Sequence, residues 1–83
     1  MLEQLEKSIL SHIPDAEVHV SDPNQDGQHF QAIVVSASFL GLPLVKQHQK
    51  VLNALKQDFA THLHAMAVQT FTPDVWQQYQ KSK

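Results

Sequence analysis

The sequence predicts a small α/β (α+β) domain with the element order α-β-β-α-(α)-β-α and a three-stranded mixed sheet that helices cover on one face. Three observations predict this class. Residues 16–21 alternate between apolar and polar side chains, residues 29–37 are rich in β-branched side chains, and apolar residues recur at helical spacing on either side of these runs. A chain of 83 residues forms one domain, 1–83, with one modest core.

The first predicted helix ends at Pro14. Before this proline, apolar residues follow the three- and four-residue spacing of a helix face: Leu2, Leu5, Ile9, Leu10 and Ile13. Glu3 precedes Lys7 by four residues, so their opposite charges interact on a helix surface. Pro14 disfavours helical backbone at the residue before it and therefore marks the end of the helix.

Two strands follow, and we expect them to pair as an antiparallel hairpin. In residues 16–21, Val18 and Val20 share one side of the strand, while Glu17 and His19 share the other. The second strand, residues 29–37, is β-branched at its centre. Between them, residues 23–27 are all turn-forming types, which predicts a loop of several residues.

A long amphipathic helix is predicted after the break at residues 41–43, where a proline suits the first turn. Its predicted core-facing stripe steps by three and four residues, and two neighbours widen it: Val45, His48, Leu52, Leu55 and Phe59, with Leu44 and Val51. We expect a break in this helix near residues 56–60. A short second helix after the break is the element written in parentheses in the predicted order.

A short strand at about residues 64–70 and a final helix complete the predicted fold. A strand–helix–strand step of this length favours a parallel pair with a right-handed crossover. Thr72 is the predicted N-cap of the last helix, Pro73 its first residue, and Asp74 a favourable charge near its positive end. The side chains expected to anchor this helix are Val75, Trp76 and Tyr79.

Composition excludes several classes of protein. The chain has no cysteine, which rules out disulfides, thiolate catalysis and a self-sufficient cysteine-ligated metal or iron–sulfur site. All six cationic residues are lysine and the formal charge is −2, which disfavours binding to a phosphate backbone. No apolar run reaches the length of a membrane span, and the first residues read as a helix and not as a signal peptide. We therefore expect a cytoplasmic protein without membrane contact.

The sequence does not predict an enzyme. Ser21, His19 and Asp22 lie close together in the chain, but neighbours on one strand point to opposite faces and no third group accompanies them. The apolar stripe and Trp76 are expected in the core and not at a cofactor.

Three ordered motifs together resemble the BolA family. Residues 39–55 resemble its signature, a Phe-x-Gly turn followed by a helix with valine, a basic–His–basic triplet and a second valine. Residues 27–36 resemble the second strand of the family. His64-Ala65-Met66-Ala67-Val68, with Thr70, Thr72-Pro73 and Trp76, resembles its C-terminal motif. Gln47-His48-Gln49 departs from the commoner Arg-His-Arg triplet and is similar to the IbaG branch.

The resemblance implies a class II KH-like fold and a non-enzymatic adaptor in iron–sulfur cluster trafficking or iron regulation. Its implied partner is a monothiol glutaredoxin, with which it shares a [2Fe–2S] cluster that glutathione also ligates; the chain alone holds no cofactor. His64 is the implied principal ligand and His29 the second. In the competing interpretation, His29 is a half-exposed residue of the strand and binds no metal. The free chain is also a candidate homodimer.

Two alternative functions stay open. One is a DNA-binding transcriptional regulator of stress response and cell morphology, with Lys46 and Lys50 as its contacts. The absence of arginine and of the second glycine of a Gly-x-x-Gly clamp after Gly41 disfavours it. The other is a histidine-dependent sensor of metal or pH. We interpret His48 as structural and assign His62 no role.

Overall fold

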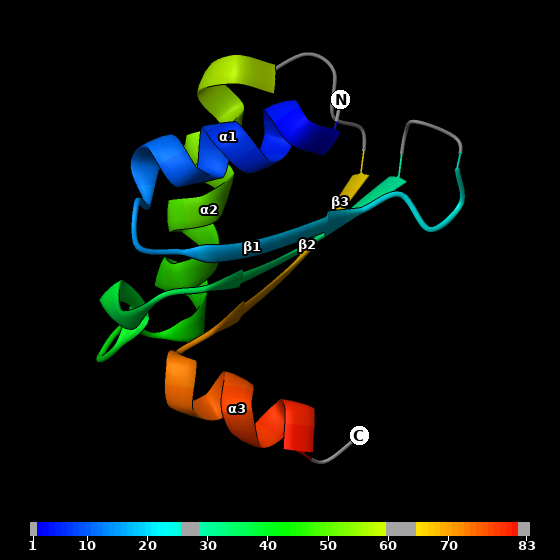
Figure 1. The fold of residues 1–83 in the computed structure, drawn as a ribbon. Helices are drawn as coiled ribbons and strands as arrows, with labels where there is room; N and C mark the ends of the chain where they lie inside the picture. Colours follow the sequence, from blue (N-terminus) through cyan, green and yellow to red (C-terminus); the bar gives the residue numbers. More distant parts are fainter. Residues whose placement is uncertain (1, 26–28, 60–64, 82–83) are drawn as a thin grey trace.

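The computed structural model describes residues 2–25, 29–59 and 65–81, and its elements follow the predicted order (Figure 1). They are α1 (Leu2–His12), β1 (Glu17–Ser21), β2 (His29–Val35), the 3₁₀ helix η1 (Ala37–Phe39), α2 (Leu44–Phe59), β3 (Ala65–Phe71) and α3 (Pro73–Lys81). The short helix η1 was not predicted. The predicted break near residues 56–60 is absent up to Phe59, because α2 continues to that residue; residue 60 lies outside the described residues.

The sheet is mixed, as the sequence predicts. Its strand order is β1-β2-β3; β1 pairs antiparallel with β2, and β2 pairs parallel with β3. In the parallel pair, His29 is the register partner of Ala65, and Val35 is the partner of Phe71. The first residues of β2 and β3 therefore lie at the same end of the sheet.

Helices α1 and α2 cover one face of this sheet and enclose the core (Figure 1). Alternate residues of β2 point into it, because successive side chains of a strand face opposite sides. The buried apolar side chains of this core are Leu5, Ile9, Ile13, Phe30, Ala32, Val34, Phe39, Val51 and Leu55. This arrangement confirms the predicted layer of helices for the first two helices.

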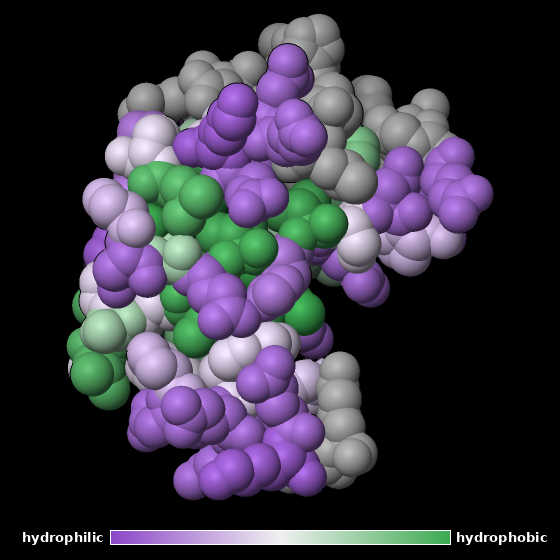
Figure 2. Space-filling model, in the orientation of Figure 1, coloured by the Kyte–Doolittle hydropathy of each residue, from purple (hydrophilic) through white to green (hydrophobic). Residues whose placement is uncertain are grey.

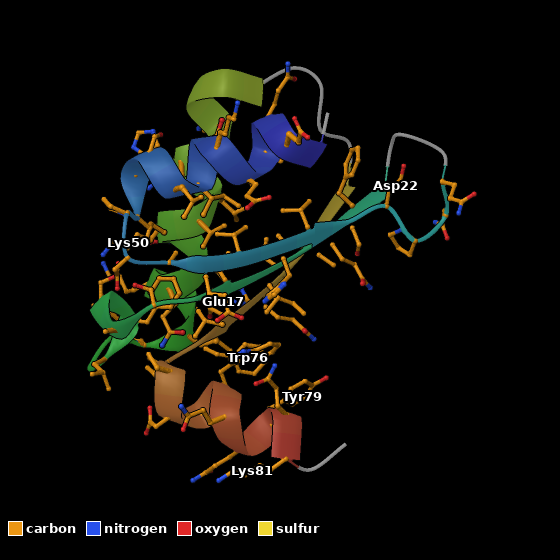
Figure 3. All side chains as sticks on the ribbon, in the orientation of Figure 1. Glu17, Asp22, Lys50, Trp76, Tyr79 and Lys81 are labelled. Carbon is orange, nitrogen blue, oxygen red and sulfur yellow. The ribbon has the colours of Figure 1, made fainter. Side chains whose placement is uncertain are left out.

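The last helix lies on the other side of the sheet (Figure 1). The Trp76 ring is tilted against the ring of Phe71, with 5.1 Å between centroids, and stacks on that of His19 at 5.8 Å. The side chains of Trp76 and Tyr79 point from α3 toward the sheet, whereas Lys81 points away (Figure 3). Because a single residue, Thr72, separates β3 from α3, the helix folds directly onto the face that Phe71 presents.

The predicted core stripe of α2 is wrong in its rotation. Val51, Ala54 and Leu55 are buried, but Val45 is 66% exposed and Leu52 is 45% exposed. The expected core position of Leu44 is also exposed, and the side chain of Phe59 lies outside the described ones. The apolar residues of α2 spread over about half of its circumference, so spacing alone does not define which part of this band faces the sheet.

Hydrogen bonds of Gln47 define the rotation of α2. Its side-chain amide donates to the carbonyl oxygen of Leu42 over 2.9 Å, and its Oε1 accepts the hydroxyl hydrogen of Thr70 at 2.7 Å. The first turn of α2 is thereby tied both to the preceding loop and to β3. Gly41 allows the tight loop because its φ of 79° is the left-handed conformation that glycine adopts without strain.

Candidate functional site

His29, one of the two histidines expected to bind a cluster, begins β2 at one end of the sheet. His29 is the first residue of β2, and its register partner on β3 is Ala65, the residue that follows His64 in the sequence. In Figure 1 this is the right-hand end of the sheet, where both strands begin. The side chain of His29 and the whole of His64 lie outside the described residues, as does His62.

The chain offers nitrogen and oxygen donors for a metal but no thiolate. Within residues 2–25, 29–59 and 65–81, no three His, Asp or Glu side chains lie together as a metal-binding group. The full sequence contains no cysteine. Rieske centres hold a [2Fe–2S] cluster with two imidazoles and two thiolates, and this sequence offers imidazoles but no thiolate.

The lysines of the alternative, nucleic-acid function lie elsewhere. Lys46 and Lys50 are exposed on α2, one helical turn apart. Figure 3 shows Lys50 on the left, far from the right-hand end where His29 begins β2. The six residue steps of β2 alone span about 20 Å at 3.3 Å per step. Lys50 therefore lies away from the start of β2.

His48 is half-buried on α2, between the core and the solvent. This position agrees with a structural side chain. His12 is exposed on α1. Neither histidine contributes to a metal-binding group of described residues.

Sequence reasoning assigned no role to His19, which the structure places in a small cluster on the second face. Its Nε2 lies 2.5 Å from Oε2 of Glu17, and its ring stacks on Trp76. The alternation of β1, which puts Glu17 and His19 on the same side, was the available signal. Both members of the pair are about half exposed, so their interaction contributes little to stability.

A cleft of about 260 Å³ opens beside this cluster, between α3 and the sheet. Its lining residues are Asp15, Glu17, Val35, Pro73, Trp76, Gln77 and Gln80. Both carboxylates are already engaged, Asp15 by the Ser36 hydroxyl and Glu17 by His19. The volume is below that of a typical small-molecule site.

Asp15 is a second residue that sequence reasoning missed, and its role is structural. Its carboxylate accepts hydrogen bonds from the Ser36 hydroxyl at 2.9 and 3.0 Å and from the backbone N–H of Ala37 at 3.2 Å. Ser36 in turn accepts the N–H of Ser38 and caps η1. These bonds fix the exit from β2 and thus the start of the loop that leads to α2.

The start of α3 agrees with the predicted cap. The carbonyl oxygen of Thr72 accepts the N–H of Trp76, and Pro73 is the first helical residue. The Thr72 hydroxyl donates to Oδ1 of Asp74, and this bond, with the N–H groups of Asp74 and Val75, holds the pKa of Asp74 below its ordinary value of 3.8. Asp74 is thus an ionised residue of the helix terminus and not a proton donor at neutral pH.

Comparison with known proteins decides the family. The model of the BolA-like protein family matches residues 2–75. The chain belongs to the BolA family. Among curated BolA-family relatives, the DNA-binding transcriptional regulator BolA of Vibrio cholerae is 34% identical over 76 residues, covering 92% of this chain and 71% of the relative. The acid stress protein IbaG of Escherichia coli is 34% identical over 74 residues, covering 88% of this chain and 84% of the relative.

Solved BolA structures share the fold. A BolA homologue from Coxiella burnetii superposes with a TM-score of 0.79 at 27% identity, covering 93% of this chain and 96% of that one. BolA1 of Arabidopsis thaliana gives a TM-score of 0.77, also at 27% identity, covering 88% of this chain and 92% of that one. The relatives are named as regulators or stress proteins and not as enzymes. No helix in the described ranges has the length and apolarity to cross a bilayer.

Proposed function

We propose that this BolA-family chain is a non-enzymatic adaptor that shares a [2Fe–2S] cluster with a monothiol glutaredoxin in cluster trafficking or iron regulation. His64 is the principal ligand from this chain and His29 the second. The observation that carries the proposal is the pairing of His29 with Ala65, the neighbour of His64, at the common start of two parallel strands.

The chemistry of the chain supports a shared cluster. Imidazole is a competent iron ligand, and replacement of thiolates by histidine raises the reduction potential of a [2Fe–2S] centre. Since the chain offers no thiolate, the remaining ligands are a cysteine of the glutaredoxin and glutathione. The cluster is then assembled only when the two proteins meet, as expected for transfer or sensing.

Reconstitution tests the proposal. The chain is mixed with a monothiol glutaredoxin, glutathione, iron and sulfide, and visible absorption and circular dichroism are recorded. His64→Ala is expected to change the cluster spectrum, while His12→Ala, at an exposed site on α1, leaves it unchanged. His64→Cys is expected to retain a cluster with a lower reduction potential, because a thiolate replaces an imidazole. An identical spectrum for wild type and His64→Ala would remove the ligand assignment.

His29→Ala tests the second ligand in the same mixture. Loss or alteration of the spectrum supports a two-histidine contribution. If His29→Ala gives the same spectrum as wild type, His29 is not a ligand and His64 is the single ligand from this chain.

A second candidate function, DNA binding, is favoured by the name of the Vibrio cholerae relative and by the exposed pair Lys46 and Lys50. A mobility-shift titration at slightly alkaline pH, where histidines are neutral, tests it. Sequence-selective binding with a steep salt dependence that Lys46→Ala and Lys50→Ala both weaken would support this function. Binding that neither substitution changes would exclude these lysines as the contact.

A further inference from the structure

Four large apolar side chains are exposed on the loop before α2 and on the first half of this helix. We name this surface the leucine–valine face; its residues are Leu40, Leu44, Val45 and Leu52, and their exposed fractions are 64%, 60%, 66% and 45%. Figure 2 shows hydrophobic atoms at the lower left, over the loop that joins η1 to α2. A group of exposed apolar side chains on a small protein marks an interaction surface.

The geometry of this face suits a helix. Val45 and Leu52 are seven residues apart on α2, so they lie two turns apart on one side of it, and Leu44 adjoins Val45. Anchors with this separation are those that two packed helices use. The core does not need these side chains, since Val51, Ala54 and Leu55 already fill the side of α2 that faces the sheet.

The charged residues nearest to the face along α2 are lysines. Between residues 44 and 56 the sequence has Lys46, Lys50 and Lys56, of which Lys50 lies on the opposite side of the helix, and Asp58 follows two residues later. Lys56 follows Leu52 by four residues and shares its side of the helix. Lys46 follows Val45 directly and lies on the flank. A partner that covers the apolar residues and carries acidic groups at its margins complements both features.

We propose that the leucine–valine face docks an acidic amphipathic helix of another protein. A second copy of this chain fits less well, because a two-fold contact between two such faces would bring the lysines of both copies together. A DNA duplex complements the lysines but leaves Val45 and Leu52 without apolar contact. The face lies on α2 and on the loop before it, which follows the far end of β2 from His29, so this docking is independent of the proposed cluster.

A peptide titration tests the proposal. The probe is a synthetic helical peptide with leucines at every third and fourth position and glutamates on both sides of this stripe. We expect it to shift the backbone amide NMR signals of residues 40–56 of the isotope-labelled chain. The affinity should fall with added salt, and a peptide with glutamine in place of glutamate should bind more weakly, because screened or absent charges cannot attract the lysines.

Matched variants locate the contact. The double variant Val45→Gln with Leu52→Gln is expected to lower the affinity about tenfold or more, since two apolar anchors are lost at exposed positions that the fold does not need. Lys46→Glu with Lys56→Glu should weaken binding through charge alone. Val75→Gln, at an exposed apolar site on α3, is the control and should bind as wild type.

Several results would overturn the proposal. These are no binding of the acidic peptide, NMR shifts outside residues 40–56, or equal affinity for wild type and the Val45→Gln/Leu52→Gln variant. Self-association in sedimentation experiments that this double variant abolishes would assign the face to a second copy. Binding of a DNA duplex that displaces the peptide and that the double variant also loses would assign it to nucleic acid.

Discussion

Thr70 of β3 donates its hydroxyl hydrogen to Oε1 of Gln47 on α2 over 2.7 Å, although the two residues are 23 positions apart in the sequence. The amide nitrogen of the same glutamine donates to the carbonyl oxygen of Leu42. One side chain thus connects the edge strand, the loop and the helix. This connection determines which side of α2 meets the sheet and, as a consequence, which side presents the leucine–valine face.

Gln47→Ala is expected to lower the free energy of unfolding by about 1–3 kcal/mol. The substitution leaves the carbonyl of Leu42 and the hydroxyl of Thr70 without this partner in a partly buried setting. Urea denaturation followed by far-ultraviolet circular dichroism measures the loss. Gln49→Ala, an exposed position on the same helix, should change stability by less than about 0.5 kcal/mol. Equal stability of the two variants would show that the Gln47 bonds are not a significant constraint.

Sequence reasoning predicted the local features of the fold well. The turn after β1, the alternation in β1, and Thr72 and Pro73 at the start of α3 act through neighbours in the chain. The structure confirms each of them, the turn as far as Gln25. Even the parallel pairing of β2 and β3 follows from the length of the helix between them. These features need no knowledge of distant contacts.

The rotation of α2, the helix η1 and the placement of α3 depend on distant contacts, and they were not predicted. The apolar residues at 44, 45, 51, 52 and 55 form one wide band along α2, and spacing did not define which edge of this band is buried. The bond between Gln47 and Thr70, and the one between Asp15 and Ser36, which are 21 positions apart, select the observed arrangement. Polar residues at such separations give no periodic signal in one sequence.

At the candidate site too, the sequence lacked information about contacts between distant residues. His64 and His29 entered through family resemblance and not through spacing. The structure adds the register between His29 and Ala65, which a single sequence does not reveal. The leucine–valine face was not recognised in the sequence because Leu44, Val45 and Leu52 were interpreted as core.

Trp76 and Val75 provide a direct test of the second face. The sequence predicts both as anchors of α3, but Trp76 is 8% exposed and contacts the rings of Phe71 and His19, whereas Val75 is 48% exposed. Val75→Ala should therefore change the free energy of unfolding by less than about 0.5 kcal/mol. Trp76→Ala should lower it by about 3 kcal/mol or more through lost packing.

The measurement is urea denaturation followed by circular dichroism, because Trp76 is the single tryptophan and its fluorescence disappears with the substitution. Trp76→Phe, which keeps an aromatic ring against Phe71, is the matched control and should lose less stability than Trp76→Ala. A larger loss for Val75→Ala than for Trp76→Ala would mean that α3 packs through its other side.

The N-terminus of α3 should make stability depend on pH in the acid range. The hydroxyl of Thr72 and the N–H groups at the start of the helix lower the pKa of Asp74 in the folded state below its ordinary value of 3.8. A carboxyl group with a lowered folded-state pKa binds a proton more readily when unfolded. Its contribution to stability is therefore fully present above the ordinary pKa and is lost as the pH falls through the folded-state value.

Asp74→Asn is expected to destabilise the protein at neutral pH and to show a weaker decline of stability on acidification than wild type. Thr72→Val removes the largest cause of the shift, so carboxyl NMR titration should find the pKa of Asp74 closer to 3.8 in this variant. Glu3→Gln, at an exposed position in the first turn of α1, is a charge-matched control for the removal of one carboxylate. The contradicting result is that wild type and Asp74→Asn lose the same stability between neutral pH and about pH 3. Other carboxyl groups would then cause the acid dependence, and the hydrogen bond from Thr72 would not contribute to the free energy of folding.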